Sequence, residues 1–171
     1  MKKILEPLVL ALVVAALAPP LLAQSASCPG HSAGVESRGD HVMGFDHDKT
    51  THHFLLTPTG GIIEVTANAE SDVASRDAIR GHLSHIAMMF ADGNFEAPML
   101  IHDQVPPGVS VIKQKGKTIS WIYGDTPAGG QVLIVTADAE ARAAIHEFLR
   151  FQIEDHHTGD STEVTNPKPR S

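Results

Sequence analysis

Two histidines and a methionine are spaced so that a helix would bring their side chains to one flank. His82, His85 and Met89 lie in "GHLSHIAMMF" (residues 81–90) at spacings of i, i+3 and i+7. On a helix these positions fall within a stripe about 60° wide, beside the core-facing line. Imidazole and thioether groups together suit copper, and Cu(I) in particular. The spacing therefore predicts a copper site, against the plainer interpretation that these are boundary residues and Met89 fills space.

Histidines and methionines elsewhere in the chain offer further ligands. In the expected strand "THHFLL" (residues 51–56), His52 and His53 must point to opposite faces, so only one of them faces the helix. His53 is favoured, because it leads into Leu55 at i+2. Zinc would accept the imidazoles but would gain little from methionine, so copper is the first choice of metal and zinc the second. The second-rank candidate ligands are Met43, Met99 and His102.

Three other histidines have structural interpretations. His146 lies next to the core line of a second expected helix and is interpreted as a packing residue. His156 and His157 end that helix, where a positive imidazolium would suit the helix dipole.

Two functions from other classes stay open. The same histidines would serve as acid, base or polar anchors in an exported enzyme or small-ligand-binding domain, or would be incidental in a protein-interaction domain. The chain contains no Gly-x-Ser-x-Gly, no phosphate-binding loop and no His-Glu-x-x-His motif. The leading hypothesis is therefore metal sequestration or handover without catalysis. The sequence names no protein partner.

The N-terminus predicts export. Lys2 and Lys3 precede the apolar run "LVLALVVAALA" (residues 8–18), and small residues follow it, which is the layout of a bacterial signal peptide. The run is too short to span a bilayer, so no stable membrane insertion is expected. We expect a signal peptide over residues 1–23, cleavage between about residues 23 and 27, and a periplasmic or secreted protein. Cys28 leaves lipid attachment open as an alternative.

Composition excludes several kinds of partner and site. A formal net charge of −7 argues against nucleic acid and against anionic membrane surfaces. A single cysteine forms neither an internal disulfide nor a cysteine-cluster metal site. Any soft-metal chemistry must therefore use methionine and the eleven histidines.

An internal repeat predicts the elements that position these residues. "TPTGGIIEVTANAE" (57–70) and "TPAGGQVLIVTADAE" (126–140) share a Thr-Pro, a Gly-Gly pair and a β-branched run. A β-type run precedes each copy and a helical pattern follows it, so the unit is strand, turn, strand and helix. The Gly-Gly pairs are expected in the hairpin turns, where positive φ is needed. Ser71 and Asp138 are the expected helix N-caps.

Two such ββα repeats predict an α+β fold with one antiparallel sheet and two helices packed on one of its faces. Between the repeats, "APMLIHD" (97–103) and "VSVIKQ" (109–114) are expected to be strands, with Gly116 in a hairpin turn. The expected organisation is a flexible lead-in over 24–40, a single domain over 41–157 and a disordered tail over 158–171.

Three segments carry a family resemblance that spans about residues 43–160. They resemble a family of small exported bacterial proteins of unsettled function, whose members are often labelled aspartate carbamoyltransferase. That label implies a longer, two-domain α/β enzyme with a Ser-Thr-Arg-Thr loop that holds a phosphate. Here the Ser-Thr pair is Ser161–Thr162, followed by Glu163, so this activity is not expected. The segments are "VMGFDHDKTTHHFLL" (42–56), "RGHLSHIAMMFADGNFEAPMLIHDQVPPGV" (80–109) and "AIHEFLRFQIEDHHTGD" (144–160).

Overall fold

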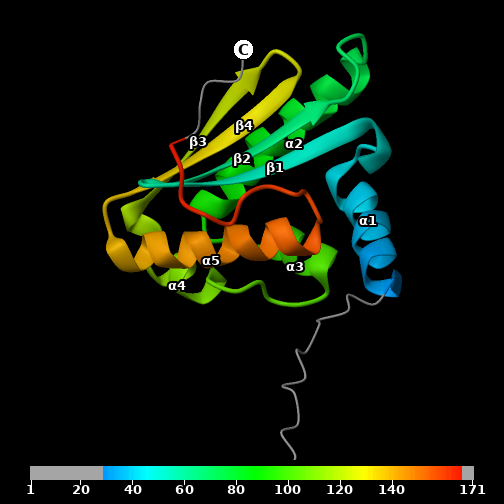
Figure 1. Ribbon diagram of the computed structural model, residues 1–171. Helices are drawn as coiled ribbons and strands as arrows, with labels where there is room; N and C mark the ends of the chain where they lie inside the picture. Colours follow the sequence, from blue (N-terminus) through cyan, green and yellow to red (C-terminus); the bar gives the residue numbers. More distant parts are fainter. Residues whose placement is uncertain (1–28, 167–171) are drawn as a thin grey trace, which may run out of the picture.

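Two β-hairpins join in one antiparallel sheet with the strand order β1-β2-β4-β3, and two long helices, α2 and α5, cover one of its faces (Figure 1). The computed structural model describes residues 29–166. The predicted α+β fold is confirmed. The elements are α1 (Pro29–Met43), the 3-10 turn η1 (His47–Lys49), β1 (Thr50–Thr57), β2 (Gly60–Ala67), α2 (Val73–Ala91), α3 (Glu96–His102), α4 (Val109–Gln114), the 3-10 turn η2 (Gly116–Thr118), β3 (Ile119–Thr126), β4 (Gly129–Thr136) and α5 (Ala139–Asp155).

The two ββα repeats are related by an approximate two-fold axis through the middle of the sheet. Ile63 of β2 pairs with Val132 of β4, and these residues occupy the same position in their respective repeats. The outer registers also correspond, because β1 pairs with β2 over the same span as β3 with β4. Each helix packs mainly on the hairpin of the other repeat: α2 lies against β3 and β4, and α5 against β1 and β2. The repeats therefore share one core.

The Gly-Gly pairs begin strands β2 and β4 and do not lie in the turns, so the turn prediction was wrong. The structure requires glycine there because the two central strands approach closely. A Cβ at Gly60 would lie 2.2 Å from the carbonyl oxygen of Ile134, and a Cβ at Gly129 would lie 2.1 Å from that of Val65. Of the two, Gly60 alone has a positive φ, at 147°.

Gly129→Ala should destabilise the fold by about 2–4 kcal/mol, because the new methyl group would meet a backbone oxygen that cannot move without breaking the central strand pair. Gly81→Ala is the control, since Gly81 lies within helix α2 and a Cβ there meets nothing within 4 Å. That control should be stabilising by about 0.5–1 kcal/mol. Urea unfolding of both variants measures the difference, and equal stabilities would contradict the close-approach argument.

The two long helices start at aspartate caps. The Asp138 carboxylate accepts from the backbone N–H of Glu140 and Ala141, as predicted for α5. For α2 the predicted cap Ser71 was wrong by one residue, because the Asp72 carboxylate accepts from Ser75 N–H. The Ser75 backbone and hydroxyl hydrogen bonds lower the pKa of Asp72.

The two segments expected as strands between the repeats are the short helices α3 and α4, and Gly116 lies in η2. Their apolar residues also fit a helical period, since Ala97 and Ile101 are four apart and Val109 and Ile112 three apart, and all four are buried. As helices, α3 packs against α1 and α4 packs against α5. Gly108, at the start of α4, has φ 79°, and a Cβ there would lie 2.1 Å from the Ala144 carbonyl oxygen.

The two ends of the described chain pack on the domain. Residues 29–43, which include the later part of the expected lead-in (29–40), form α1, which lies beside α3 (Figure 1). The early part of the expected tail lies against β1: Asp160 accepts from Phe54 N–H, and Thr165 N–H donates to the Leu56 carbonyl. The predicted signal peptide lies outside the described residues. None of the helices in 29–166 is long and apolar enough to cross a membrane.

Candidate metal centre

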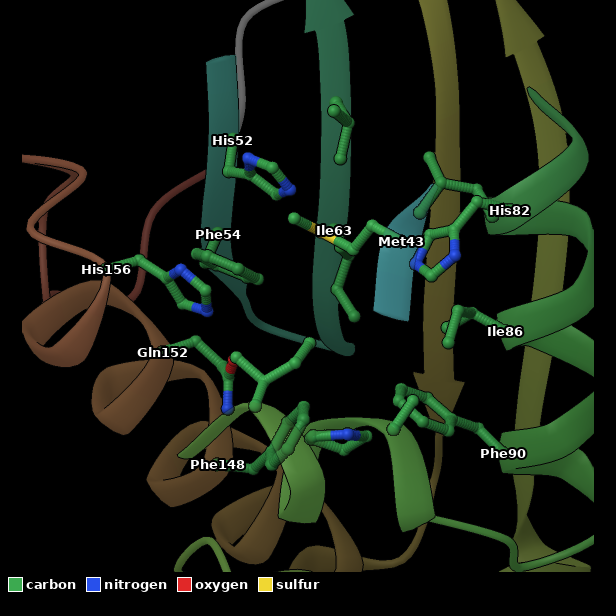
Figure 2. Close-up of a pocket in the computed structure, with 15 residues that line it drawn as sticks. Met43, His52, Phe54, Ile63, His82, Ile86, Phe90, Phe148, Gln152 and His156 are labelled. Atoms are coloured by element: carbon green, nitrogen blue, oxygen red, sulfur yellow. The ribbon is translucent and has the colours of Figure 1, made fainter. Parts of the chain in front are cut away.

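A cavity of about 60 Å³ lies in the shared core, lined from β1, β2, α1, α2, α3 and α5 (Figure 2). Most of its lining is aliphatic or aromatic, and its polar lining consists of three imidazoles and one carboxamide. None of the described lining residues carries a carboxylate, an ammonium or a guanidinium group. The lining residues are Met43, His52, Phe54, Ile63, Val65, His82, Leu83, Ile86, Phe90, Ala97, Pro98, Ile101, Phe148, Gln152 and His156.

His52 enters the cavity from strand β1. Alternation along the strand directs His52 and Phe54 to the helix-covered face, and His53 to the opposite one. The preference for His53 was therefore wrong. Removal of the His52 ring from water, together with the charges that His82, His53 and His47 would carry, lowers its pKa to about 4. His52 is neutral near pH 7 and has a free lone pair for a ligand.

His82 enters the cavity from α2, with its ring edge-on to Phe45 at a centroid distance of 5.6 Å. Desolvation, with a smaller contribution from His85, lowers its pKa to about 4. His82 therefore also presents a neutral imidazole. In Figure 2 the side chain of Met43 enters the cavity between His52 on one side and His82 on the other.

His156 is the third imidazole, at the C-cap of α5. Its ring stacks on that of His52, with 5.8 Å between centroids and 9° between planes. Desolvation, then His52 and His102, lower its pKa to about 3, so it carries no charge near neutral pH. The interpretation of His156 as a charged group that complements the helix dipole was therefore wrong.

The ring nitrogens of these three half-buried imidazoles form no hydrogen bond to any other described residue, and the Nε2 of Gln152, in the same lining, is buried without a partner among the described residues. Buried polar groups usually have hydrogen-bond partners, and neutral imidazole nitrogens are common metal ligands. A thioether and three imidazoles that line one cavity are donor types that suit soft ions. The chemistry that this arrangement supports is coordination.

His102, by contrast, has both ring nitrogens occupied. Nδ1 lies 2.5 Å from the Asp155 carboxylate and Nε2 lies 3.0 Å from the carboxamide oxygen of Gln152. The residue is buried, with 1 % of its surface exposed. Its ring is edge-on to His156 at 4.9 Å, so it supports the cavity wall and does not line the cavity.

The remaining predicted ligands lie away from the cavity. His53 Nδ1 lies 2.9 Å from the Asp160 carboxylate on the other side of β1. His85 is exposed on α2, and Met89 packs partly buried against the core. Met99 lies exposed on α3. The structure thus brings together Met43, His52 and His82 from the predicted set, but not these four.

One group of metal-binding residue types clusters elsewhere. Ligand atoms of Asp40, Asp46 and His47 lie within 4.8 Å of one another and would hold a metal ion. These side chains already bond to one another and to the chain: His47 Nδ1 lies 2.9 Å from Asp40, and Asp46 accepts from Asp48 N–H. The cluster is half-buried and oxygen-rich, so its chemistry suits harder cations than the cavity does.

A second, more polar cavity of about 270 Å³ adjoins the first. The two share Met43, His52 and His156, which therefore lie between an apolar space and a more polar one. The other lining residues of the second cavity are Val35, Gly39, His47, Thr50, Thr51, His157 and Thr158.

His156 is the functional candidate that the sequence pattern missed, although the repeat contains the signal. Aligning the Ala-Ile of the two helices, at 78–79 and 144–145, matches His156 to the core residue Phe90 and His82 to Phe148. His146 is structural, as predicted, because its Nε2 donates to the carbonyl oxygens of Thr57 and Gly60 at the first hairpin turn.

Comparison of the chain with models of protein families, with curated proteins and with solved structures gives no match, so the functional argument rests on the cavity itself.

Proposed function

We propose that this is an exported metal-binding protein that holds one Cu(I) ion through Met43, His52 and His82, for sequestration or handover. The observation that supports this most is a set of neutral imidazoles, without hydrogen-bond partners among residues 29–166, beside a thioether in one cavity. A metal ion competes with protons for imidazole nitrogen, and here the pKa of each ring is already far below neutral. The sites are therefore ready to accept an ion at pH 7 without releasing protons.

The charge of the cavity favours a monovalent ion. A buried charge is costly unless it is paired, and the described lining offers no carboxylate to pair with a cation. A divalent ion would bring twice the uncompensated charge of Cu(I) into these apolar surroundings. Zinc sites also use thiolate, imidazole or carboxylate and gain little from a thioether. Copper is therefore the preferred metal, and zinc the second.

The position of the ligands suits exchange. Met43 and His52 line both cavities, and both cavities are partly open, so a bound ion would be reachable from solvent. His156, stacked on His52, is placed to bind the ion in passage or to replace a departing ligand. Such a site suits handover better than permanent structural storage.

A second candidate function is the binding of a small organic ligand, with the same imidazoles as polar anchors. The apolar lining of the cavity favours it, since ligand pockets are mostly hydrophobic with a few polar groups. Metal uptake separates the two functions. Under the second, purified protein would bind no copper in competition with a chelator.

Anaerobic titration with Cu(I) against a chromogenic Cu(I) chelator tests the proposal. We expect one ion per chain, and a weaker complex with Zn(II) in a parallel titration with a zinc indicator. Binding should weaken as pH falls through the imidazole range of the cavity, about pH 4, and not near 6.5. Absence of copper uptake at neutral pH would refute the proposal.

Met43→Leu should separate copper from zinc. Leucine keeps the side-chain volume and removes the sulfur, so we expect Cu(I) affinity to fall at least about tenfold while Zn(II) affinity is unchanged. The exchange should cost less than about 1.5 kcal/mol of stability. Met99→Leu, at an exposed position on α3, is the control and should leave both affinities unchanged. Equal Cu(I) affinity in wild type and Met43→Leu would remove the thioether from the site.

A further inference from the structure

The two edges of the sheet are not equally covered. β1 and β3 are the outer strands, and they occupy equivalent positions in the two repeats (Figure 1). At the edge of β1, Phe54 N–H donates to the Asp160 carboxylate, and the Leu56 carbonyl accepts from Thr165 N–H. The main packing partners of β3 are its neighbour β4 and the helix α2 on the sheet face. No group in residues 29–166 hydrogen-bonds to the outer edge of β3.

Every second residue of β3 directs its backbone N–H and C=O to that outer edge. The hairpin turn fixes which residues these are. Thr126 and Gly129 face each other across a two-residue turn and close the hairpin with hydrogen bonds, so the bonds to β4 continue at positions 124, 122 and 120. In β1 the same rule directs Phe54 and Leu56 outward, and these are the residues that the C-terminal segment covers. The outward residues of β3 are Ile119, Trp121, Tyr123 and Asp125.

β3 has none of the features that usually keep an edge strand unpaired. Such strands are protected by proline, by lysine or by a bulge, and β3 runs for eight residues in unbroken register without any of these. Ile122 is 51 % exposed on the sheet face opposite α2 and α5. It ends an apolar row across the sheet that also contains Leu133, Ile62 and Leu55. An edge of this kind is a template for a further strand.

We infer that a second copy of this chain pairs with this edge, β3 antiparallel to β3, so that two four-stranded sheets become one continuous sheet. A two-fold axis between the copies produces such a pairing. Full overlap of the outward groups fixes the register. Trp121 then lies opposite the partner's Tyr123, and Ile119 opposite the partner's Asp125. Ile122 lies at the axis, opposite the partner's Ile122.

The contacts that this register creates are self-complementary, which favours a second copy over an unrelated strand. The exposed side chain of Ile122 is covered by its own counterpart, and the apolar row continues from one sheet into the other. On the other face, Trp121 and Tyr123 form two aromatic cross-strand pairs. No like charges meet, because Asp125 is the only charged residue of β3 and it faces isoleucine. The dimer is independent of the proposed copper site, since no residue of β3 lines either cavity.

Cysteine cross-linking of the full-length protein without its predicted signal peptide tests the register. In a Cys28→Ser background, Ile122→Cys places two thiols opposite each other at the axis, where Cα atoms lie about 4.5 Å apart, within the range of a disulfide. We expect a covalent dimer after incubation with oxidised glutathione. Ser120→Cys, exposed on the same face, is the matched control. Its counterpart lies four residues, about 13 Å, along the strands, so it should remain monomeric on a non-reducing gel.

Ile122→Lys tests the affinity without a cross-link. It places two ammonium groups opposite each other, so the dimer dissociation constant from analytical ultracentrifugation should rise at least about tenfold. Met88→Lys, at a 59 % exposed position on α2, is the control and should self-associate as wild type does. Circular dichroism checks the folding of each variant, and the cysteine pair decides if Ile122→Lys does not fold. A wild-type protein that is monomeric at every concentration would overturn the inference. So would equal cross-linking at positions 120 and 122, or a dimer that Ile122→Lys leaves intact.

Discussion

His52→Leu should lose Cu(I) affinity by more than about 100-fold, while His53→Leu should bind the ion as wild type does. Loss of groups that only support a ligand already costs about 10–100-fold, so loss of a ligand itself should exceed that. The two residues are neighbours in β1 but lie on opposite faces: one enters the cavity and the other contacts Asp160. The pair therefore separates the effect of the cavity from any general effect of removing a histidine from this strand.

The measurement is competition with a Cu(I) chelator, with a thermal unfolding curve for each variant. His52→Leu should fold at least as well as wild type, because the imidazole it removes has no hydrogen-bond partner among the described residues and leucine is apolar. A folded His52→Leu protein with wild-type affinity would contradict the proposed ligand set. So would a large loss of affinity in His53→Leu that is not matched by a loss of stability.

The metal-free protein should lose stability steeply between about pH 6.5 and pH 4. An unfolded imidazole titrates near 6.5, whereas burial lowers the folded pKa of His52 and His82 to about 4 and that of His156 to about 3. Between these values the unfolded chain binds more protons than the folded one, so acid favours unfolding. Each such ring makes the free energy of unfolding fall by about 1.4 kcal/mol per pH unit in that window. Above about pH 7 this loss is absent.

Urea unfolding at a series of pH values from 7.5 to 4.5 measures this slope. His82→Leu should reduce it, because one group with a lowered pKa is removed. Saturating Cu(I) should flatten the curve, since the ion holds the rings in their deprotonated form. A wild-type curve that is flat between pH 6.5 and pH 5 would show that these rings titrate normally in the fold.

The repeat made most of the fold predictable from the sequence. Two copies of one strand-turn-strand-helix pattern allowed the sheet and its two helices to be inferred, because each copy repeated the periodicity and the Asp138 cap was recognisable. The segments between the copies had no such second example. There the short apolar runs of 97–102 and 109–114 fit a strand as well as a helix, and contacts distant in sequence, such as that of α4 with α5, decided.

The candidate site was predictable only in part, for a related reason. A single helix indicates which residues share a flank, so His82 was found together with His85 and Met89. The pattern of one helix does not show which part of that flank other elements will face. The cavity is lined only by the side of α2 that faces β1 and α5. His85 and Met89 lie outside the part of α2 that lines the cavity. The choice between His52 and His53 depended on the facing of β1, which a strand pattern with apolar residues on both faces does not determine.

The approximate two-fold axis also explains how the cavity came to be so one-sided. In a symmetric pair of identical half-length chains, the positions of His82 and Phe148 would have to carry the same residue, and so would those of Phe90 and His156. Any imidazole on one side would then be repeated on the other. Joining the halves in one polypeptide releases each position to diverge from its counterpart. Duplication followed by fusion would thus turn a symmetric cavity, with the same side chains in both halves, into one with imidazoles at some positions and apolar side chains at the equivalent positions.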